Sequence, residues 1–296
     1  AEFIPVHPLF INSNEQLPIK CTKVPYNEII QKSSHNSYED KPSITDQLQN
    51  YYIRSLELDI WDHKLLLSDV EGDWFVYHAP VVATKTSCNM LSECLGELKA
   101  WSDANPRHEP VTVWIDLKTR LKSRNRMDER LTASGLDIYT PYEFLGGHAT
   151  LKEAASHGWP TERSLRGKFI FIFSDKSYSY CSTDEKCNHE QRKAFRHCEA
   201  PASEGFCVFF NQNIDETKIE TFKQLHESGY TTRAYYVNDN HTWRYALFNR
   251  VNHIATDEID FKKHPWARTH NKFGGPFQYI NHESKTPPQY ETQALE

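Results

Sequence analysis

The feature that most constrains this chain is a recurrence of short apolar segments, which are separated by helical or loop stretches. Eight such segments occur in the 296 residues, at 29–34, 55–61, 74–77, 111–117, 169–173, 207–210, 232–237 and 252–255. Stretches 127–136, 151–158 and 219–228 have the amphipathic spacing of helices. Strands that alternate with helices favour parallel pairing, and eight of them predict an α/β fold, a TIM-like (β/α)8 barrel, regular or distorted.

The length predicts one domain over residues 1–296. Barrels of this size form a single unit, and no repeat, low-complexity run or linker divides the barrel region. The segment 263–296 is rich in Pro, Gly, His and Asn, so we expect an irregular C-terminal tail.

The charge balance limits the partners. A formal net charge of −6 gives no general attraction to nucleic acid or to an anionic membrane, and the basic residues are dispersed. No run of about 18 apolar residues occurs, so no transmembrane segment is predicted. We expect a monomer whose contact with lipid is local.

The seven cysteines indicate the compartment. Three pairs lie close together in polar loops, and we expect disulfides at Cys88/Cys94, Cys181/Cys187 and Cys198/Cys207, with Cys21 left free. Loop cysteines in pairs are typical of exported proteins, and a start at Ala1 is compatible with a removed signal peptide or a trimmed chain. A secreted or periplasmic protein, peripheral to membranes when it acts, is expected.

Polar residues gather where the predicted strands end. A parallel barrel brings the carboxyl ends of all its strands to one face, where active sites form. We therefore expect these residues to surround one cavity: His35, Asn36, Asp59, His78, Asp116, Lys118, Ser174, Asp175, Asn211, Arg233, Tyr235 and Asp257.

Two of the strands carry carboxylates on one face. Side chains alternate along a strand, so Glu57 and Asp59 point away from the apolar neighbours, as do Asp116 and Lys118 in the fourth segment. One such strand alone could equally belong to an antiparallel sheet whose acidic face is exposed to solvent. Two together favour a carboxylate-lined cavity, where mutual repulsion implies a hard cation with oxygen ligands, calcium or magnesium.

Among fifteen histidines, position singles out two. His35 and His78 end separate predicted strands, whereas His63, His108, His148 and His189 lie in loops, helices or polar stretches. Imidazole titrates near neutral pH, so a pair of this kind suits general base and general acid catalysis, although a lone histidine is more often structural.

Three motifs then resemble one enzyme family. They are Ser34-His35-Asn36-Ser37-Tyr38, the run 53–62 (Ile-Arg-Ser-Leu-Glu-Leu-Asp-Ile-Trp-Asp), and Val76-Tyr77-His78. In order and separation they resemble the X region of phosphoinositide-specific phospholipase C, and most closely its secreted, calcium-dependent bacterial-type branch. Further on, Arg233-Ala-Tyr235 and Ala255-Thr256-Asp257 resemble later parts of the same family.

The resemblance implies roles for individual residues. His35 and His78 would be the catalytic pair, with Glu57 competing with His35 as base. One Ca²⁺ would be bound by Asn36, Glu57, Asp59 and Asp116, although Asp116 departs from the glutamate usual in the animal enzymes. Lys118, Arg233 and Tyr235 would hold the headgroup.

The implied reaction is cleavage of phosphatidylinositol at a membrane surface to diacylglycerol and inositol cyclic phosphate. The lysines that animal enzymes direct at ring phosphates have no clear match, because 169–173 is nearly all apolar. An unphosphorylated headgroup is therefore expected.

Two alternatives are open. A glycerophosphodiester phosphodiesterase or a phospholipase D-like enzyme uses two histidines and a metal on the same barrel. A non-catalytic barrel could bind inositol lipids through the same cavity.

Overall fold

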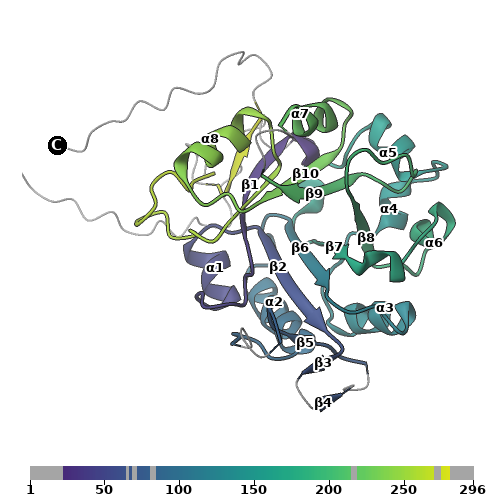
Figure 1. The fold of residues 1–296 in the computed structure, drawn as a ribbon. Helices are drawn as coiled ribbons and strands as arrows, with labels where there is room; N and C mark the ends of the chain where they lie inside the picture. Colours follow the sequence, from purple (N-terminus) through teal and green to yellow (C-terminus); the bar gives the residue numbers. More distant parts are fainter. Residues whose placement is uncertain are drawn as a thin grey trace, which may run out of the picture.

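The chain forms a closed barrel of eight parallel strands. The computed structural model describes residues 23–280, apart from 65–66, 69–71, 81–84, 215–218 and 270–274. The barrel strands follow one another in space in chain order, and β11 pairs with β1, which also pairs with β2 (Figure 1). They are β1 (Ile29–Ser34), β2 (Ser55–Trp61), β6 (Val111–Leu117), β7 (Phe169–Asp175), β8 (Ala194–Cys198), β9 (Phe209–Asn213), β10 (Thr231–Tyr235) and β11 (His253–Thr256). The predicted TIM-like barrel is thus confirmed.

Helices surround the strands (Figure 1). They are α1 (Ile44–Asn50), α2 (Leu91–Ala104), α3 (Arg124–Ala133), α4 (Pro141–Leu145), α5 (Leu151–His157), α6 (Asp184–Asn188), α7 (Ile219–Glu227) and α8 (Asn240–Phe248). The three helices predicted from amphipathic spacing correspond to α3, α5 and α7. Every helix in the described ranges is too short or too polar to cross a lipid bilayer.

One predicted barrel strand is wrong and another was missed. Segment 74–77 contains β5 (Phe75–Val76), which pairs antiparallel with the end of β2 as a hairpin arm, while β6 lies beside β2 in the barrel. The barrel strand that was not predicted from the sequence is β8. Its sequence Ala-Phe-Arg-His-Cys has only two adjacent apolar residues, followed by Arg and His, so it offers neither a long apolar run nor a regular alternation to detect.

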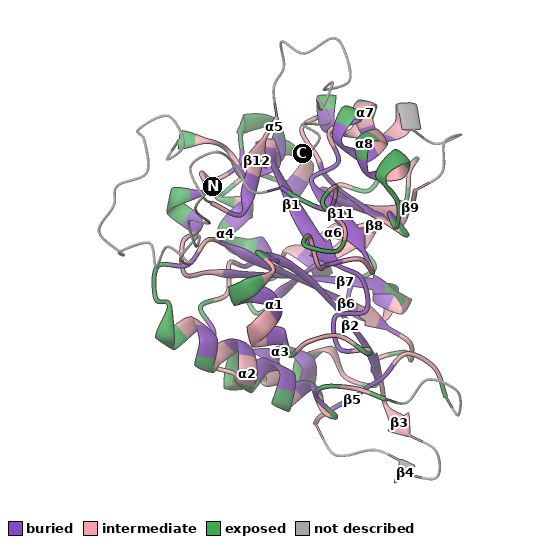
Figure 2. Ribbon diagram, turned by 90° about the vertical axis from the view of Figure 1, so that its left-hand side faces the viewer, coloured by how far each residue is buried: buried purple, intermediate pink, exposed green. Residues whose placement is uncertain are grey.

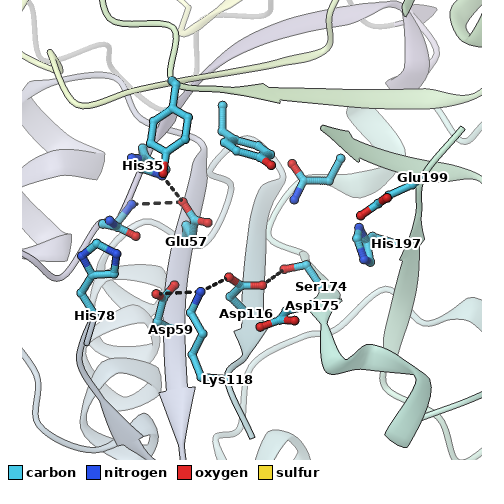
Figure 3. A pocket seen from close by; sticks show the side chains of 14 residues that line it. His35, Glu57, Asp59, His78, Asp116, Lys118, Ser174, Asp175, His197 and Glu199 are labelled. Carbon is cyan, nitrogen blue, oxygen red and sulfur yellow. Dashed lines mark hydrogen bonds and ion pairs between the residues drawn. The ribbon is translucent and has the colours of Figure 1, made fainter. Parts of the chain in front are cut away.

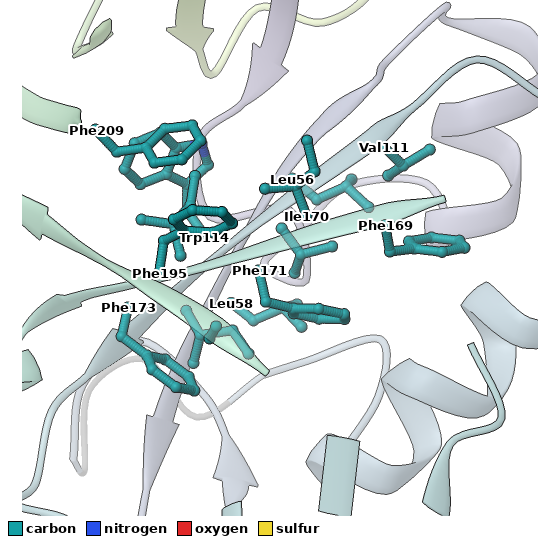
Figure 4. Packing of buried hydrophobic residues seen from close by; sticks show 14 of the residues in the cluster. Leu56, Leu58, Val111, Trp114, Phe169, Ile170, Phe171, Phe173, Phe195 and Phe209 are labelled. Carbon is teal, nitrogen blue, oxygen red and sulfur yellow. The ribbon is translucent and has the colours of Figure 1, made fainter. Parts of the chain in front are cut away.

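The alternation within β2 and β6 has the predicted consequence. Leu56, Leu58 and Phe171 are fully buried in the apolar layer outside the barrel, together with Phe169 and Phe173 (Figure 4). Val113 of β6 is fully buried in the same cluster. Figure 2 shows this buried layer along the strands, with exposed residues on the outer helix faces. The opposite side chains of the same strands point into the barrel.

Large side chains close the barrel below its carboxyl-terminal end. Trp114 and His253 pack edge to face with ring centroids 5.5 Å apart, and the Arg233 guanidinium lies 5.4 Å from the Trp114 ring centroid. The His253 imidazole shares a hydrogen bond of 3.0 Å with Ser55 Oγ. All of these side chains are buried, so the open space of the barrel is confined to one end.

Three disulfides join loop segments, as predicted: Cys88–Cys94, Cys181–Cys187 and Cys198–Cys207. Cys21 lies outside the described residues. Part of the segment expected to be an irregular tail is ordered, since β12 (Phe277–Tyr279) adds antiparallel to β1. A two-stranded hairpin, β3 (His63–Lys64) with β4 (Leu67–Ser68), projects from the end of β2 (Figure 1).

Candidate active site

The carboxyl ends of the barrel strands surround a cavity of about 300 Å³. Figure 3 shows the side chains that line this cavity, which come from several strands. Of the nine residues to which the family resemblance assigns a role, eight line it and Arg233 does not; of the other strand-end residues expected there, Ser174, Asp175 and Asn211 line it and Asp257 does not. The lining residues are His35, Asn36, Glu57, Asp59, His78, Asp116, Lys118, Ser174, Asp175, His197, Glu199, Asn211, Tyr235 and Tyr236.

Three carboxylates meet on the cavity floor. Each of Glu57, Asp59 and Asp116 offers an oxygen, and these oxygens lie within 4.8 Å of one another. Neighbouring strands produce this arrangement, because Asp59 of β2 is directly opposite Asp116 of β6 in the parallel register. Within the ranges that the structure describes, no other group of three or more such ligands is this compact.

The electrostatics of this cluster favour a cation. Burial, followed by the charge of Glu57, raises the pKa of Asp59 well above its usual value, and the nearby Lys118 offsets this only in part. Asp59 Oδ1 is buried without a hydrogen-bond partner in the structure. A buried acceptor of this kind is costly unless a ligand satisfies it. The donor set of hard oxygens therefore fits calcium.

Lys118 neutralises part of the cluster. Its ammonium lies between Asp59 and Asp116, 3.3 Å from Asp59 Oδ2 and in contact with Asp116 Oδ2 (Figure 3). Ser174 Oγ donates to the other Asp116 oxygen at 2.7 Å. Although burial alone would raise the pKa of Asp116, Lys118 and Ser174 lower it, so this carboxylate is ionised.

Asn36 belongs to the tight turn that follows β1. Its backbone is left-handed, with φ of 46°, a conformation that Asn adopts more readily than most residues. The turn directs its N–H at Glu57 Oε2, 3.1 Å away. The residue next to the catalytic-histidine candidate is thereby fixed against the carboxylate cluster.

Arg233 lies beneath the cavity. Its side chain is fully buried, and Nη2 donates to Glu57 Oε2 at 2.7 Å while Nη1 donates to Asn211 Oδ1 at 3.0 Å. The expected grip on a headgroup has no geometric support, because the guanidinium is enclosed by the barrel interior. Glu57 Oε2 is engaged by Arg233 and Asn36, which leaves Oε1 as the oxygen for a ligand.

His35 is held on both sides of its ring. Nδ1 shares a hydrogen bond of 3.0 Å with Asp257 Oδ1, while Nε2 lies 3.9 Å from Glu57 Oε2. The ring stacks at 6.3 Å on Tyr235 and meets Tyr236 edge-on at 4.9 Å. Burial opposes ionisation of Asp257, but His35, Lys41 and Asn238 lower its pKa below the ordinary range, so it is an acceptor for His35.

His78 lies on the opposite side of the cavity from His197 and Glu199, just after the β5 hairpin arm (Figure 3). The Tyr77 N–H donates to the Asp59 carbonyl oxygen at 3.3 Å, which ties this arm to β2. His78 Nδ1 lies 3.0 Å from Glu39 Oε2. His78 was expected at the end of a barrel strand, but the antiparallel hairpin arm β5 carries it to the cavity.

The wall opposite His78, here called the far wall, contains two cavity residues that were not predicted from the sequence, His197 and Glu199. His197 and Glu199 of the β8 region lie opposite His78, with Asp175 below them (Figure 3). Burial lowers the pKa of His197 to about 4, so the ring is neutral at pH 7, and its Nδ1 is buried without a partner in the structure. Strand-end position correctly singled out Asp257, which directly follows β11, but nothing in the sequence marks His197 because β8 has no strand pattern.

Comparison with protein families decides the class of this site. The family model described as "Phosphoinositide phospholipase C, Ca2+-dependent" matches residues 71–255. The chain belongs to this family. The enzyme is therefore a phosphoric diester hydrolase of the phospholipase C type, from a calcium-dependent family. The matched range includes His78, Asp116 and Lys118 and begins after His35 and Glu57.

Solved structures agree on the fold. A calcium-dependent phosphoinositol-specific phospholipase C from a Pseudomonas species is 20% identical, with a TM-score of 0.72, and the match covers 89% of this chain and 98% of that chain. A calcium-dependent phosphatidylinositol-specific phospholipase C from Streptomyces antibioticus is also 20% identical, with a TM-score of 0.69 over 81% of this chain and 96% of that chain. A comparison with curated protein sequences found no match.

Proposed function

We propose that this phospholipase C cleaves phosphatidylinositol to diacylglycerol and inositol cyclic phosphate. The observation that carries the proposal is that His35 and His78 line one cavity together with the carboxylate cluster (Figure 3). In the reaction, the inositol 2-hydroxyl oxygen bonds to phosphorus, and the bond from phosphorus to the glycerol oxygen breaks. Attack within one molecule has an entropic advantage.

Asn36, Glu57, Asp59 and Asp116 would hold one Ca²⁺. The compact carboxylates, the orphaned Asp59 oxygen and the Oε1 atom of Glu57 support this ligand set. When bound, calcium supplies Lewis-acid stabilisation of negative charge on the hydroxyl and phosphoryl oxygens.

His35 is the better candidate for the base. Asp257 holds its Nδ1, so Nε2 faces the cavity and can take the proton of the 2-hydroxyl group. Glu57, the rival base, already accepts from Arg233 and Asn36. The lowered pKa of Asp257 keeps the partner of His35 charged, which stabilises the imidazolium that forms.

His78 would protonate the departing glycerol oxygen. An alkoxide leaving group needs a proton in the transition state, so His78→Ala should lower turnover of the lipid on the order of 10²- to 10⁴-fold. An inositol phosphodiester with a nitrophenolate leaving group needs far less help, and this variant should recover much of its relative rate on it. His35→Ala should stay slow on both substrates. If His78→Ala lowered the rate on both substrates by the same factor, His78 would not be the general acid.

The headgroup would lie between Lys118, Tyr235 and the far wall. Two carboxylates of that wall, Asp175 and Glu199, line the cavity and would repel a ring phosphate, which supports an unphosphorylated inositol ring as the substrate. Asp175→Asn combined with Glu199→Gln should raise the rate on phosphatidylinositol 4-phosphate several-fold relative to phosphatidylinositol. An unchanged ratio would argue against this selectivity.

The enzyme would act as a monomer outside the reducing cytosol, on the surface of a membrane. Three disulfides support an oxidising compartment. Sedimentation of the purified enzyme should give a single species of one chain, and a dimer would contradict the proposal.

The direct test is phosphorus NMR of phosphatidylinositol vesicles with the enzyme. With calcium, the phosphodiester signal should convert to that of a five-membered cyclic phosphate, and excess chelator should stop the conversion. A linear phosphomonoester as the first product would contradict the cyclic route. Full activity in chelator would contradict the metal assignment.

A further inference from the structure

The position of His78 needs support from outside its own strand. The arm that carries it is β5, a strand of two residues, and the His78 side chain is 44% exposed. Little packing therefore restrains the ring, whereas His35 is enclosed by Asp257 and two tyrosines. A general acid must nevertheless present one particular nitrogen to the substrate.

Glu39 supplies that restraint from the turn after β1. Its Oε2 lies 3.0 Å from His78 Nδ1, and its side chain is only 22% exposed. A carboxylate accepts but does not donate, so this ion-pair contact favours a proton on Nδ1. The Nε2 edge of the ring is then the edge left for the cavity that His78 lines.

The same oxygen also fixes Asn36. Asn36 Nδ2 donates to Glu39 Oε2 at 3.3 Å, so the NH₂ end of the amide is directed at Glu39. The carbonyl end, Oδ1, is left as the oxygen that can face a cation. The short turn holds Glu39 in place, because the Glu39 N–H donates to the Asn36 carbonyl oxygen at 3.0 Å.

We propose that Glu39 is a positioning residue that orients the acid His78 and the calcium ligand Asn36 with a single carboxylate oxygen. The inference rests on the proposed function of both partners. In the transition state the proton on His78 Nε2 passes to the glycerol oxygen, and the Nδ1 proton stays beside the Glu39 carboxylate. Glu39 therefore gains no proton, and its charge faces the imidazolium until the proton has left.

The test uses Glu39→Ala and Glu39→Gln in the full chain, each assayed on phosphatidylinositol and on the nitrophenyl inositol phosphodiester. Loss of a supporting carboxylate of this kind is expected to lower activity by about 10- to 100-fold. For Glu39→Ala we expect that loss on the lipid, a smaller loss on the nitrophenyl substrate, and a higher calcium concentration for half-maximal activity. Glu39→Gln keeps an acceptor oxygen without the charge and should lie between the wild type and the alanine variant.

Asp40→Asn is the matched control. It removes a carboxylate from the same turn, but Asp40 is 64% exposed and pairs with Lys85 away from the cavity, so activity and calcium response should be unchanged. Equal losses on both substrates with an unaltered calcium response, or no loss at all, would overturn the inference. Failure of the proposed function would look different, since the wild-type enzyme would then not form cyclic phosphate in a calcium-dependent way.

Discussion

At the scale of single residues, Asp59 has the least favourable ionisation in the site. Burial and Glu57 raise its pKa, so its charged form is costly without a cation. We expect Asp59→Asn to lower calcium-dependent turnover by at least about 100-fold, while thermal stability in chelator is kept or raised. Calcium titration of activity and thermal denaturation check this, with Asp103→Asn on the surface of α2 as the control. Wild-type turnover by Asp59→Asn would contradict the ligand assignment.

Arg233 is a second residue-scale test, because its burial conflicts with the headgroup role that the family motif implies. Arg233→Ala leaves Glu57 without its buried partner, and we expect a loss of about 3–5 kcal/mol in the free energy of unfolding. Urea denaturation measures that loss. A variant that keeps its stability but no longer distinguishes inositol from choline lipids would restore the headgroup role.

At the scale of elements, β1 carries a lysine on its outer face that is almost fully buried. Lys32 Nζ donates to the carbonyl oxygens of Ile259 at 2.9 Å and Ala267 at 3.2 Å, which fastens the segment after β11 to the barrel. Burial, with a smaller contribution from Arg268, lowers its pKa from 10.5 to about 7.

The sign of the resulting pH dependence follows from proton binding. Below pH 7 both states hold the proton, and folding bears the full cost of burying the charge. Between about pH 7 and 10.5 only the unfolded state holds it, so Lys32 makes stability rise with pH over this window. Lys32→Met should remove this part of the slope in urea unfolding, whereas the exposed Lys262→Met should not. Parallel wild-type and Lys32→Met profiles would contradict the lowered pKa.

The connection from β8 to β9 is the second test at the element scale. No helix bridges residues 199–208, and the Cys198–Cys207 disulfide closes this loop beside Glu199. Replacing both cysteines with serine should cost about 2–3 kcal/mol of stability and should weaken selectivity against ring phosphates. The Cys88→Ser/Cys94→Ser variant should lose similar stability without the change in selectivity. If the variant without Cys198 and Cys207 kept the wild-type selectivity, the disulfide would not be needed to position the far wall.

At the scale of the whole molecule, barrel closure couples the two ends of the described chain. β1 pairs with β2, β11 and β12, so the first and last described strands are adjacent. We expect one cooperative unfolding transition, with equal calorimetric and van't Hoff enthalpies in chelator. Two resolved transitions would contradict a single domain over 1–296.

The sequence by itself determined most of the barrel and one side of the site. Side-chain alternation in β2 and β6 placed Glu57, Asp59 and Asp116 toward one cavity, because a period of two is a local property of any strand. Strand-end position placed His35 at the same cavity, because parallel strands share one carboxyl-terminal edge. The local cysteine pairs were equally accessible, since a separation of 6 or 9 residues limits their partners.

Only the tertiary structure decided the rest, because it depends on contacts between residues distant in sequence. β8 is a barrel strand because it pairs with β7 and β9 on its two sides, whereas its own residues give no apolar pattern. Arg233 became a partner of Glu57, 176 residues away, once the barrel interior enclosed it. The pairing of Glu39 with His78 likewise depends on how a hairpin arm folds back over the turn after β1, which local propensity does not specify.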